Sequence, residues 1–278
     1  MSIAPSDVLL TDRVAVVTGG GSGIGRGIAA GLAAFGAKVA IWERNAEPCA
    51  SAADETGALG ITCDVRDSGQ VDAALAQTVA ELGPVTILVN NAGGVFWSGI
   101  LDTTENGWDA LYKSNLRHVY LCTQRVARHL VEQNSRVEQK LSGSIISVTS
   151  IEGVRAAPGY ATYAAAKAGV INYTKTAALE LAAHGIRVNA LAPDLTMTEG
   201  IRSISPPGTE ERASLMIPMG RPGHVDEMAR AAVFLASDMS SYITGQTIHV
   251  DGGTQASSGW SHHPDTGEYV LGLTPHPL

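Results

Sequence analysis

Cysteines, basic residues and long apolar runs are scarce in this sequence. Its three cysteines, Cys49, Cys63 and Cys122, are far apart, which excludes a disulfide framework and a C-x-x-C zinc motif. Acidic residues outnumber basic ones by 27 to 19, giving a formal net charge of −8. That balance argues against binding to nucleic acid or to an anionic membrane, both of which need basic patches.

Membrane and export signals are also missing. The chain has no apolar run long enough to span a bilayer, and residues 1–12 lack the basic start and apolar centre of a signal peptide. Together with the sparse cysteines, this predicts a cytoplasmic protein with no membrane partner and no metal.

Short apolar runs alternate with alanine-rich segments of helical period. We expect strands at 14–17, 39–42, 60–63, 85–89, 144–148, 187–191 and 247–250, and helices at 24–35, 108–132, 163–183 and 225–236. Alternation of this kind predicts parallel strands joined by right-handed crossovers. The expected fold is a single α/β domain over residues 1–278, doubly wound and Rossmann-type, with a mostly parallel sheet of about seven strands and helices on both faces.

Three segments interrupt the alternation. Residues 133–143 are polar and predict a surface loop, and residues 194–221 contain several prolines and glycines and predict a lid. Residues 254–278 form a C-terminal extension with apolar groups at Trp260, Tyr269, Leu271 and Leu273. The extension is either a disordered tail or, as its apolar groups favour, a segment that packs on a neighbouring subunit beside the substrate pocket.

A glycine-rich turn follows the first expected strand and precedes the first helix. Residues 18–25 read T-G-G-G-S-G-I-G, with Gly19, Gly23 and Gly25 in the pattern T-G-x-x-x-G-x-G. Glycine lets a pyrophosphate approach the backbone, and the free N–H groups at the helix start suit a phosphate. Any tight turn can use glycine, but this placement favours a dinucleotide site.

This turn resembles that of the short-chain dehydrogenase/reductase family, in its shorter branch. The family's N-N-A-G signature is present at 90–93, and Y-x-x-x-K is present at 163–167. The turn, the strand ends and the resemblance together imply a set of cofactor contacts: Thr18, Gly19, Gly21, Ser22, Gly23, Ile24, Gly25, Glu43, Arg44, Cys63, Asp64, Val65, Asn91, Ala92, Gly93, Tyr163, Lys167, Pro193, Thr196 and Thr198.

The acidic residue at the end of the second strand indicates which cofactor is bound. Glu43 is placed to accept hydrogen bonds from ribose hydroxyls and to repel a 2′-phosphate, and Ser22 stands where relatives that use NADP carry a basic residue. Arg44 could grip a phosphate, although a solvated surface charge is the simpler interpretation. We therefore expect NAD rather than NADP.

Tyr163 and Lys167 stand four residues apart and so share one helix face. A phenol titrates near pH ~10, and an ammonium ~4 Å away supplies ~4 kcal/mol toward ionising it at an effective dielectric constant of ~20. The resemblance implies that Tyr163 is the general acid/base and that Lys167 lowers its pKa. It also implies that Ser150, thirteen residues earlier, holds the substrate oxygen and that Asn115 supports a proton path. Taken alone, Ser150 also fits a strand-end serine bonded to local backbone, and Asn115 fits a buried residue that mends a helix kink.

The substrate side of the site is less determined. The expected pocket residues are Val95, Phe96, Trp97, Val154, Arg155, Tyr160 and the lid. Asp194 stands where the family usually has glycine, and it either faces the nicotinamide or points to solvent.

The predicted function is hydride transfer between NAD(H) and a secondary alcohol or ketone. One alternative is an NADPH-dependent reductase of 3-oxoacyl thioesters on the same fold, and another is a non-catalytic NAD-binding sensor protein. The alanine-rich faces of the helices at 108–132 and 163–183 predict a homotetramer or homodimer.

Overall fold

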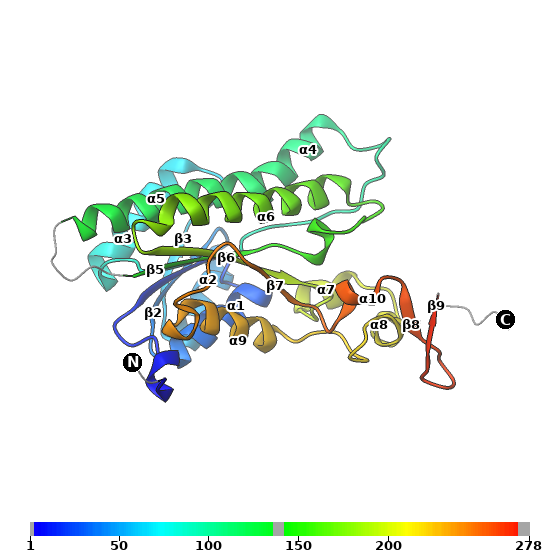
Figure 1. The fold of residues 1–278 in the computed structure, drawn as a ribbon. Helices are drawn as coiled ribbons and strands as arrows, with labels where there is room; N and C mark the ends of the chain where they lie inside the picture. Colours follow the sequence, from blue (N-terminus) through cyan, green and yellow to red (C-terminus); the bar gives the residue numbers. More distant parts are fainter. Residues whose placement is uncertain (1–2, 136–141, 272–278) are drawn as a thin grey trace.

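A seven-stranded parallel sheet forms the centre of the computed structural model, which describes residues 3–135 and 142–271 (Figure 1). The sheet order is β3-β2-β1-β4-β5-β6-β7. The strands are β1 (Val14–Thr18), β2 (Lys38–Glu43), β3 (Leu59–Thr62), β4 (Ile87–Asn90), β5 (Gly143–Val148), β6 (Ile186–Pro193) and β7 (Thr247–Val250). The order reverses between β1 and β4, and a ligand crevice forms at such a reversal, beyond the carboxyl ends of the strands.

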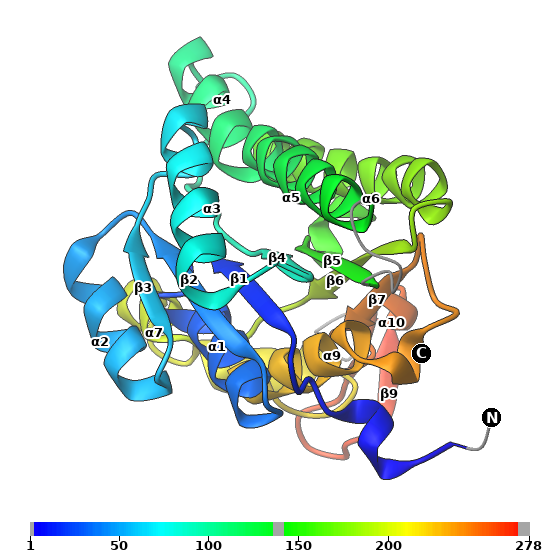
Figure 2. The same ribbon diagram turned by 90° about the vertical axis from the view of Figure 1, so that its left-hand side faces the viewer.

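Helices cover both faces of the sheet, as Figure 2 shows. One layer holds α1 (Gly23–Ala34), α2 (Ala46–Thr56) and α9 (Val225–Ala236), and the other holds α3 (Ser68–Leu82), α4 (Glu105–Tyr112), α5 (His118–Asn134) and α6 (Ala161–Ala182). Short helical turns are η1 (Pro5–Val8), η3 (Ile151–Gly153), η4 (Asp238–Ser240) and α10 (Thr254–Ser257). Among the described residues, none of these helices has the length and apolar character to cross a membrane.

Alternating side chains of the strands build a core on each face. In β1, Ala15 and Val17 pack on the α1 and α9 side, whereas Val14 and Val16 pack on the α5 and α6 side. All five residues of β1 are buried. A strand covered on both faces has no polar face, which is why the sequence shows apolar runs rather than alternation.

The predicted fold class is confirmed, and all seven expected strands are present within a few residues of their predicted bounds. Helices α2 and α3 lie outside the ranges predicted from the sequence. Neither is strongly apolar, and α3 is started by Asp67, whose carboxylate accepts from the backbone N–H groups of Gly69 and Gln70.

The prediction of one regular helix over 108–132 is wrong. The helix begins earlier, at Glu105, because the Thr104 hydroxyl caps it by accepting from Gly107 N. A π-helical turn, η2 (Lys113–Arg117), then separates α4 from α5. Such turns insert one residue into the helical ladder and often mark functional sites.

The predicted loop at 133–143 is wrong at both ends of its range. Gln133 and Asn134 belong to α5, and Gly143 starts β5. The rest of the prediction falls mostly on residues 136–141, which lie outside the described part of the chain.

The 194–221 segment contains two helices, α7 (Glu199–Ile204) and α8 (Thr209–Met216). The C-terminal extension lies beside it, as an antiparallel hairpin of β8 (Trp260–His262) and β9 (Tyr269–Leu271) with β8 packed against α8. The His262 ring stacks on Tyr269 at 4.6 Å and its Nε2 lies 3.1 Å from the Pro218 carbonyl oxygen. The disordered alternative for the extension is therefore wrong up to Leu271, while Leu273 lies outside the described residues.

This packing predicts that the hairpin protects α8. A chain ending at Gly259 should exchange the amide hydrogens of α8 ~10-fold faster than the full chain, because local opening is easier once β8 is lost. A chain ending at Leu271 keeps the hairpin and serves as the control. Exchange of α8 at an unchanged rate in the shorter chain would contradict the packing; the central strands should exchange alike in all three.

Candidate active site

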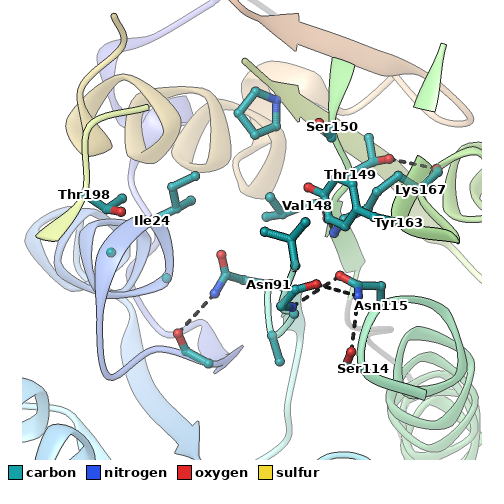
Figure 3. A pocket seen from close by; sticks show the side chains of 18 of the residues that line it. Ile24, Asn91, Ser114, Asn115, Val148, Thr149, Ser150, Tyr163, Lys167 and Thr198 are labelled. Atoms are coloured by element: carbon teal, nitrogen blue, oxygen red, sulfur yellow. Dashed lines mark hydrogen bonds between the residues drawn. The ribbon is translucent and has the colours of Figure 1, made fainter. Parts of the chain in front are cut away.

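A cleft of about 970 Å³ opens at the carboxyl ends of the strands, where the sheet order reverses. Residues from the β1–α1 turn, the ends of β2 to β6 and the 194–221 segment line it. In Figure 3, Ser150, Tyr163 and Lys167 lie together on one side, Ile24 and Thr198 lie on the other, and Asn91 lies between them.

The glycine-rich turn lies against the backbone that follows β4. Gly19 and Gly23 have φ angles of +63° and +52°, which favour glycine. At Gly25 even a Cβ would overlap the Gly19 carbonyl oxygen and the Asn91 amide. Gly19, Gly23 and Gly25 leave a bare backbone surface in front of the first turn of α1, which suits a phosphate group.

Thr18 and Asn91 join the two loops that carry this surface. The Thr18 hydroxyl accepts from the backbone N–H groups of Asn91 and Ala92, both at 3.0 Å, and donates to Val89 O at 3.3 Å. The Asn91 amide donates to the carbonyl oxygens of Thr18 and Gly19 at 3.0 and 3.1 Å. Thr18 does not itself line the cleft, so it supports the predicted cofactor contacts from behind.

Gly21 does not line the cleft either, because Glu43 covers it. A Cβ on Gly21 would lie 2.8 Å from Glu43 Cγ. Glu43 is buried at the end of β2, lines the cleft, and accepts from Asn45 N through Oε1 at 3.1 Å. The predicted neighbour Arg44 also lines the cleft and is exposed, which agrees with the interpretation as a solvated charge.

At the end of β3 the expected contacts Cys63, Asp64 and Val65 all line the cleft. The Asp64 carboxylate is held by Arg66, whose Nε and Nη2 both donate to it, and this hydrogen bonding lowers the Asp64 pKa. Arg66 is a cleft residue that the sequence reasoning missed. Burial raises the pKa of the Cys63 thiol to about 12, so the thiol is neutral.

The four predicted catalytic residues line one end of the same cleft. Ser150 lies two residues after the end of β5, and Tyr163 and Lys167 lie on the first two turns of α6. The Lys167 ammonium is buried, donates to the Val148 carbonyl oxygen at 2.9 Å, and lies 5.5 Å from the centre of the Tyr163 ring. The Thr149 hydroxyl returns a hydrogen bond to the Lys167 carbonyl oxygen at 2.8 Å, as Figure 3 shows.

Asn115 lies in the π-helical turn η2 and bonds in two directions. Its side-chain amide donates to the Leu111 carbonyl oxygen, one turn earlier, at 3.0 Å, and to the Gly94 carbonyl oxygen at 2.8 Å. It thus supplies a hydrogen bond within the irregular helix and also holds the loop after β4 against that helix. Gly93 lies close by: a Cβ there would be 2.9 Å from Asn115 Oδ1.

The electrostatics differ from the sequence prediction at Tyr163. Burial raises the pKa of Tyr163, hydrogen bonding with Ser150 opposes the rise, and the charge of Glu152 adds to it. Lys167 is not among the causes of this shift, and its ammonium donates to the Val148 carbonyl oxygen. Burial in turn lowers the pKa of Lys167 to about 8. Near neutral pH, Tyr163 is therefore protonated and Lys167 is mostly charged.

The structure places some of the predicted contact residues on the far wall of the cleft and others away from it. Pro193, Thr196 and Thr198 line it, and so do the predicted substrate residues Val95 and Tyr160. The predicted pocket residues Phe96, Trp97 and Val154 do not line it; the Trp97 ring lies over Gly159 instead. From the predicted lid, Leu195, Ile201 and Met216 line the wall, and it also includes residues that the sequence did not single out: Glu152, Ala156, Ala157 and Pro158.

Asp194 lies within the cleft and is not directed to bulk solvent. Its side chain is 15% exposed and pairs with Arg155 at 3.6 Å. The interpretation that Asp194 points to solvent is therefore wrong, and its effect on a nicotinamide stays a prediction. No group of three or more His, Cys, Asp or Glu side chains in the described part of the chain could hold a metal ion.

His118 is a buried residue beside the site that the sequence reasoning missed. Burial, followed by the charge of Lys167, lowers its pKa to about 3, so the ring is neutral. It starts α5, three residues after Asn115. A histidine on a largely apolar helix face gives no sequence signal of this position.

Comparison with known proteins identifies the family. A family profile described as enoyl-(acyl carrier protein) reductase matches residues 19–255. A protein of Chlamydia muridarum named 3-oxoacyl-[acyl-carrier-protein] reductase FabG is 39% identical over 254 residues, covering 88% of this chain and 98% of its own. The Escherichia coli protein of the same name is 38% identical over 245 residues, covering 87% and 96%.

Solved structures agree with this match. A short-chain type dehydrogenase/reductase from Mycobacterium marinum superposes with a TM-score of 0.83 at 34% identity, covering 90% of this chain and 98% of its own. A 7α-hydroxysteroid dehydrogenase, complexed with NADH and 7-oxo glycochenodeoxycholic acid, superposes with a TM-score of 0.85 at 29% identity, covering 91% and 98%.

Because its ammonium is buried, we predict that Lys167 lowers the free energy of unfolding of the protein. Lys167→Met should raise the free energy of unfolding at pH 7 by ~1–3 kcal/mol, because a neutral side chain loses no hydration there. The lysine pKa is about 8 when folded and near 10.5 when unfolded. The cost is therefore full below pH 8, and the gain from the substitution should shrink as the pH rises from 8 toward 10.5.

Urea denaturation of both proteins at several pH values measures this difference. Lys175→Met, at an exposed position on the same helix, is the matched control and should change stability little at any pH. A Lys167→Met protein that is less stable than the parent at pH 7 would show that the lysine contributes more through its hydrogen bond to Val148 than its burial costs.

Proposed function

Because this chain belongs to the short-chain dehydrogenase/reductase family, we propose that it reduces the ketone of a 3-oxoacyl thioester with NADH. The observation that carries the proposal is the grouping of Ser150, Tyr163 and Lys167 at one end of a cleft whose other end is the glycine-rich turn. The same grouping argues against a non-catalytic NAD sensor, which would not need these residues.

The proposed substrate is a 3-oxoacyl thioester rather than a secondary alcohol or ketone in general. The curated relatives, 38–39% identical over almost their whole length, are named reductases of 3-oxoacyl groups on acyl carrier protein. The direction of reaction agrees with the electrostatics: a phenol whose pKa is raised keeps its proton near neutral pH and can donate it to a carbonyl oxygen.

The residues of the cleft fit a dinucleotide. The bare backbone of Gly19, Gly23 and Gly25 suits the pyrophosphate, and Glu43 suits the adenosine ribose. Asn91, Ala92 and Gly93 continue this surface toward Lys167. When bound, NADH supplies the hydride that adds to the carbonyl carbon.

The remaining steps belong to the chain itself. The Ser150 hydroxyl holds the substrate oxygen, and Tyr163 donates its phenolic proton to that oxygen as negative charge develops on it. Lys167 holds the start of α6 against the end of β5 through its hydrogen bond to the Val148 carbonyl oxygen, so it positions Tyr163. Asn115 keeps the loop after β4 in place, so the cofactor-binding surface keeps its position relative to Tyr163.

We propose NADH rather than NADPH because of the carboxylate at the end of β2. Two like unit charges ~4 Å apart repel each other by ~4 kcal/mol at an effective dielectric constant of ~20. The Glu43 carboxylate therefore strongly disfavours a 2′-phosphate beside it. The basic neighbours compensate little, since Arg66 is bound to Asp64 and Arg44 is exposed.

Assembly and location stay predictions. A homotetramer or homodimer formed through α4, α5 and α6 is supported by the exposed apolar side chains on these helices, namely Trp108, Tyr112, Tyr120 and Leu179. A cytosolic location rests on the composition of the sequence alone.

A substrate panel tests the proposed reaction. Loss of NADH absorbance should be seen with a 3-oxoacyl thioester and, more weakly, with simple ketones. Tyr163→Phe should bind NADH as the parent does but lose at least ~100-fold in kcat, because the proton donor is gone. Tyr160→Phe alters another tyrosine of the cleft, one without a lysine four residues on, and should keep most of the activity. Full activity of Tyr163→Phe would refute the assignment.

The cofactor prediction has its own test. Glu43→Ser should raise kcat/KM for NADPH by at least ~10-fold and lower it for NADH by a similar factor, because the charge that opposes the 2′-phosphate and binds the ribose is removed. The matched control is Glu47→Ser, at an exposed position on α2. A parent enzyme that already prefers NADPH would overturn the cofactor assignment and leave the reaction type untouched.

A further inference from the structure

An arginine between two carboxylates lies in the substrate end of the cleft. Arg155 Nη2 is 3.0 Å from Glu152 Oε1 and 3.6 Å from Asp194 Oδ1, and all three residues line the cleft. Neither the proposed hydride transfer nor the dinucleotide site uses this ionic network. Three charged groups in the wall of a substrate pocket need a chemical reason, because taking each of them partly out of water is unfavourable.

The network spans the ends of two neighbouring strands. On the β5 side, the Ser150 hydroxyl accepts from Glu152 N at 3.2 Å, so the turn that carries Glu152 is bonded to the predicted oxygen-holding residue. On the β6 side, Asp194 follows Pro193 at the end of the strand. Arg155 therefore connects the turn after β5 to the end of β6. If Ser150 and Tyr163 hold the ketone oxygen, the substrate lies beside this connection.

The guanidinium has donors to spare. An arginine carries five N–H donors, and among the described residues Arg155 makes one hydrogen bond, from Nη2 to Glu152. The pairing with Asp194, at 3.6 Å, is an ion pair too long for a hydrogen bond. The Arg155 side chain is 41% exposed, against 23% for Glu152 and 15% for Asp194, so Arg155 is the most accessible member of the network.

The charge of the network decides which acceptor fits. One guanidinium and two carboxylates sum to −1, so an anionic group in the substrate would meet repulsion from Glu152 and Asp194. A neutral carbonyl oxygen accepts from the guanidinium without that repulsion. In a 3-oxoacyl thioester a second, neutral carbonyl stands two bonds from the ketone carbon.

Resting on the proposed function, we propose that Arg155 is the specificity-determining residue that recognises the thioester carbonyl of the substrate. Ser150 and Tyr163 hold the ketone oxygen and Arg155 donates to the second carbonyl oxygen, so the site selects 1,3-dicarbonyl compounds. Glu152 and Asp194 keep the guanidinium in position, and their negative charge rejects free 3-oxo acids.

The test compares two substrates that differ in one carbonyl. The first is the N-acetylcysteamine thioester of 3-oxobutanoate, and the second is the ketone in which a methylene group replaces the thioester carbonyl. Arg155→Met keeps an unbranched side chain and removes the donors. It should lower the ratio of kcat/KM for thioester over ketone by ~10–100-fold, mainly through KM, because one charged hydrogen bond is lost.

Three further variants sharpen the comparison. Arg155→Lys retains a cationic donor and should restore part of the ratio. Asp194→Asn should raise kcat/KM for free 3-oxobutanoate relative to the thioester by ~10-fold, because one repelling charge is removed. Arg230→Met, at an exposed position on α9 and outside the cleft, is the matched control and should leave both ratios unchanged.

The outcomes separate this inference from the function on which it rests. If the parent reduces neither substrate with NADH or NADPH, the proposed function fails and the inference fails with it. If the parent reduces both substrates equally well, or if Arg155→Met lowers both activities by the same factor, Arg155 does not recognise the second carbonyl. The proposal that the protein reduces carbonyl groups would be unaffected by either result.

Discussion

The site depends on one buried ammonium group and the two hydrogen bonds around it. Lys167 Nζ donates to the carbonyl oxygen of Val148, and the hydroxyl of Thr149 donates to the carbonyl oxygen of Lys167. This reciprocal pair joins the end of β5 to the second turn of α6. Ser150 follows Thr149, and Tyr163 lies one helical turn before Lys167, so the same pair brings both side chains to the cleft. Burying an ammonium group is unfavourable, and buried charges of this kind are typical of functional sites.

A second set of hydrogen bonds holds the cofactor end of the cleft. Thr18 and Asn91 join the glycine-rich turn to the loop after β4, and Asn115 joins Gly94 of that loop to the π-helical turn. The irregular helix is therefore part of the site rather than a defect, since it places a side-chain amide where the loop needs partners. Backbone held in this way needs little rearrangement when a ligand binds.

Charge is distributed unevenly along the cleft. Glu43 and the Asp64–Arg66 pair lie at the adenosine end, and the Glu152–Arg155–Asp194 network lies at the substrate end. Between them, Lys167 is the buried cation. The negative surroundings and the burial of Tyr163 act together to keep its proton in place. A protonated phenol beside a buried cation is a suitable state for an enzyme that delivers a proton to a carbonyl oxygen.

The order of strands and helices, the glycine-rich turn and the Tyr163–Lys167 spacing could be read from the sequence, because periodicity and spacing are local properties of the chain. Helices α2 and α3, with weaker apolar faces, and the π-helical turn required the structure. The tertiary structure alone decided the direction of the Tyr163 pKa, the partner of Lys167 and the position of Arg155 between two carboxylates. Each of these depends on burial and on distances between side chains from different strands, which no local pattern encodes.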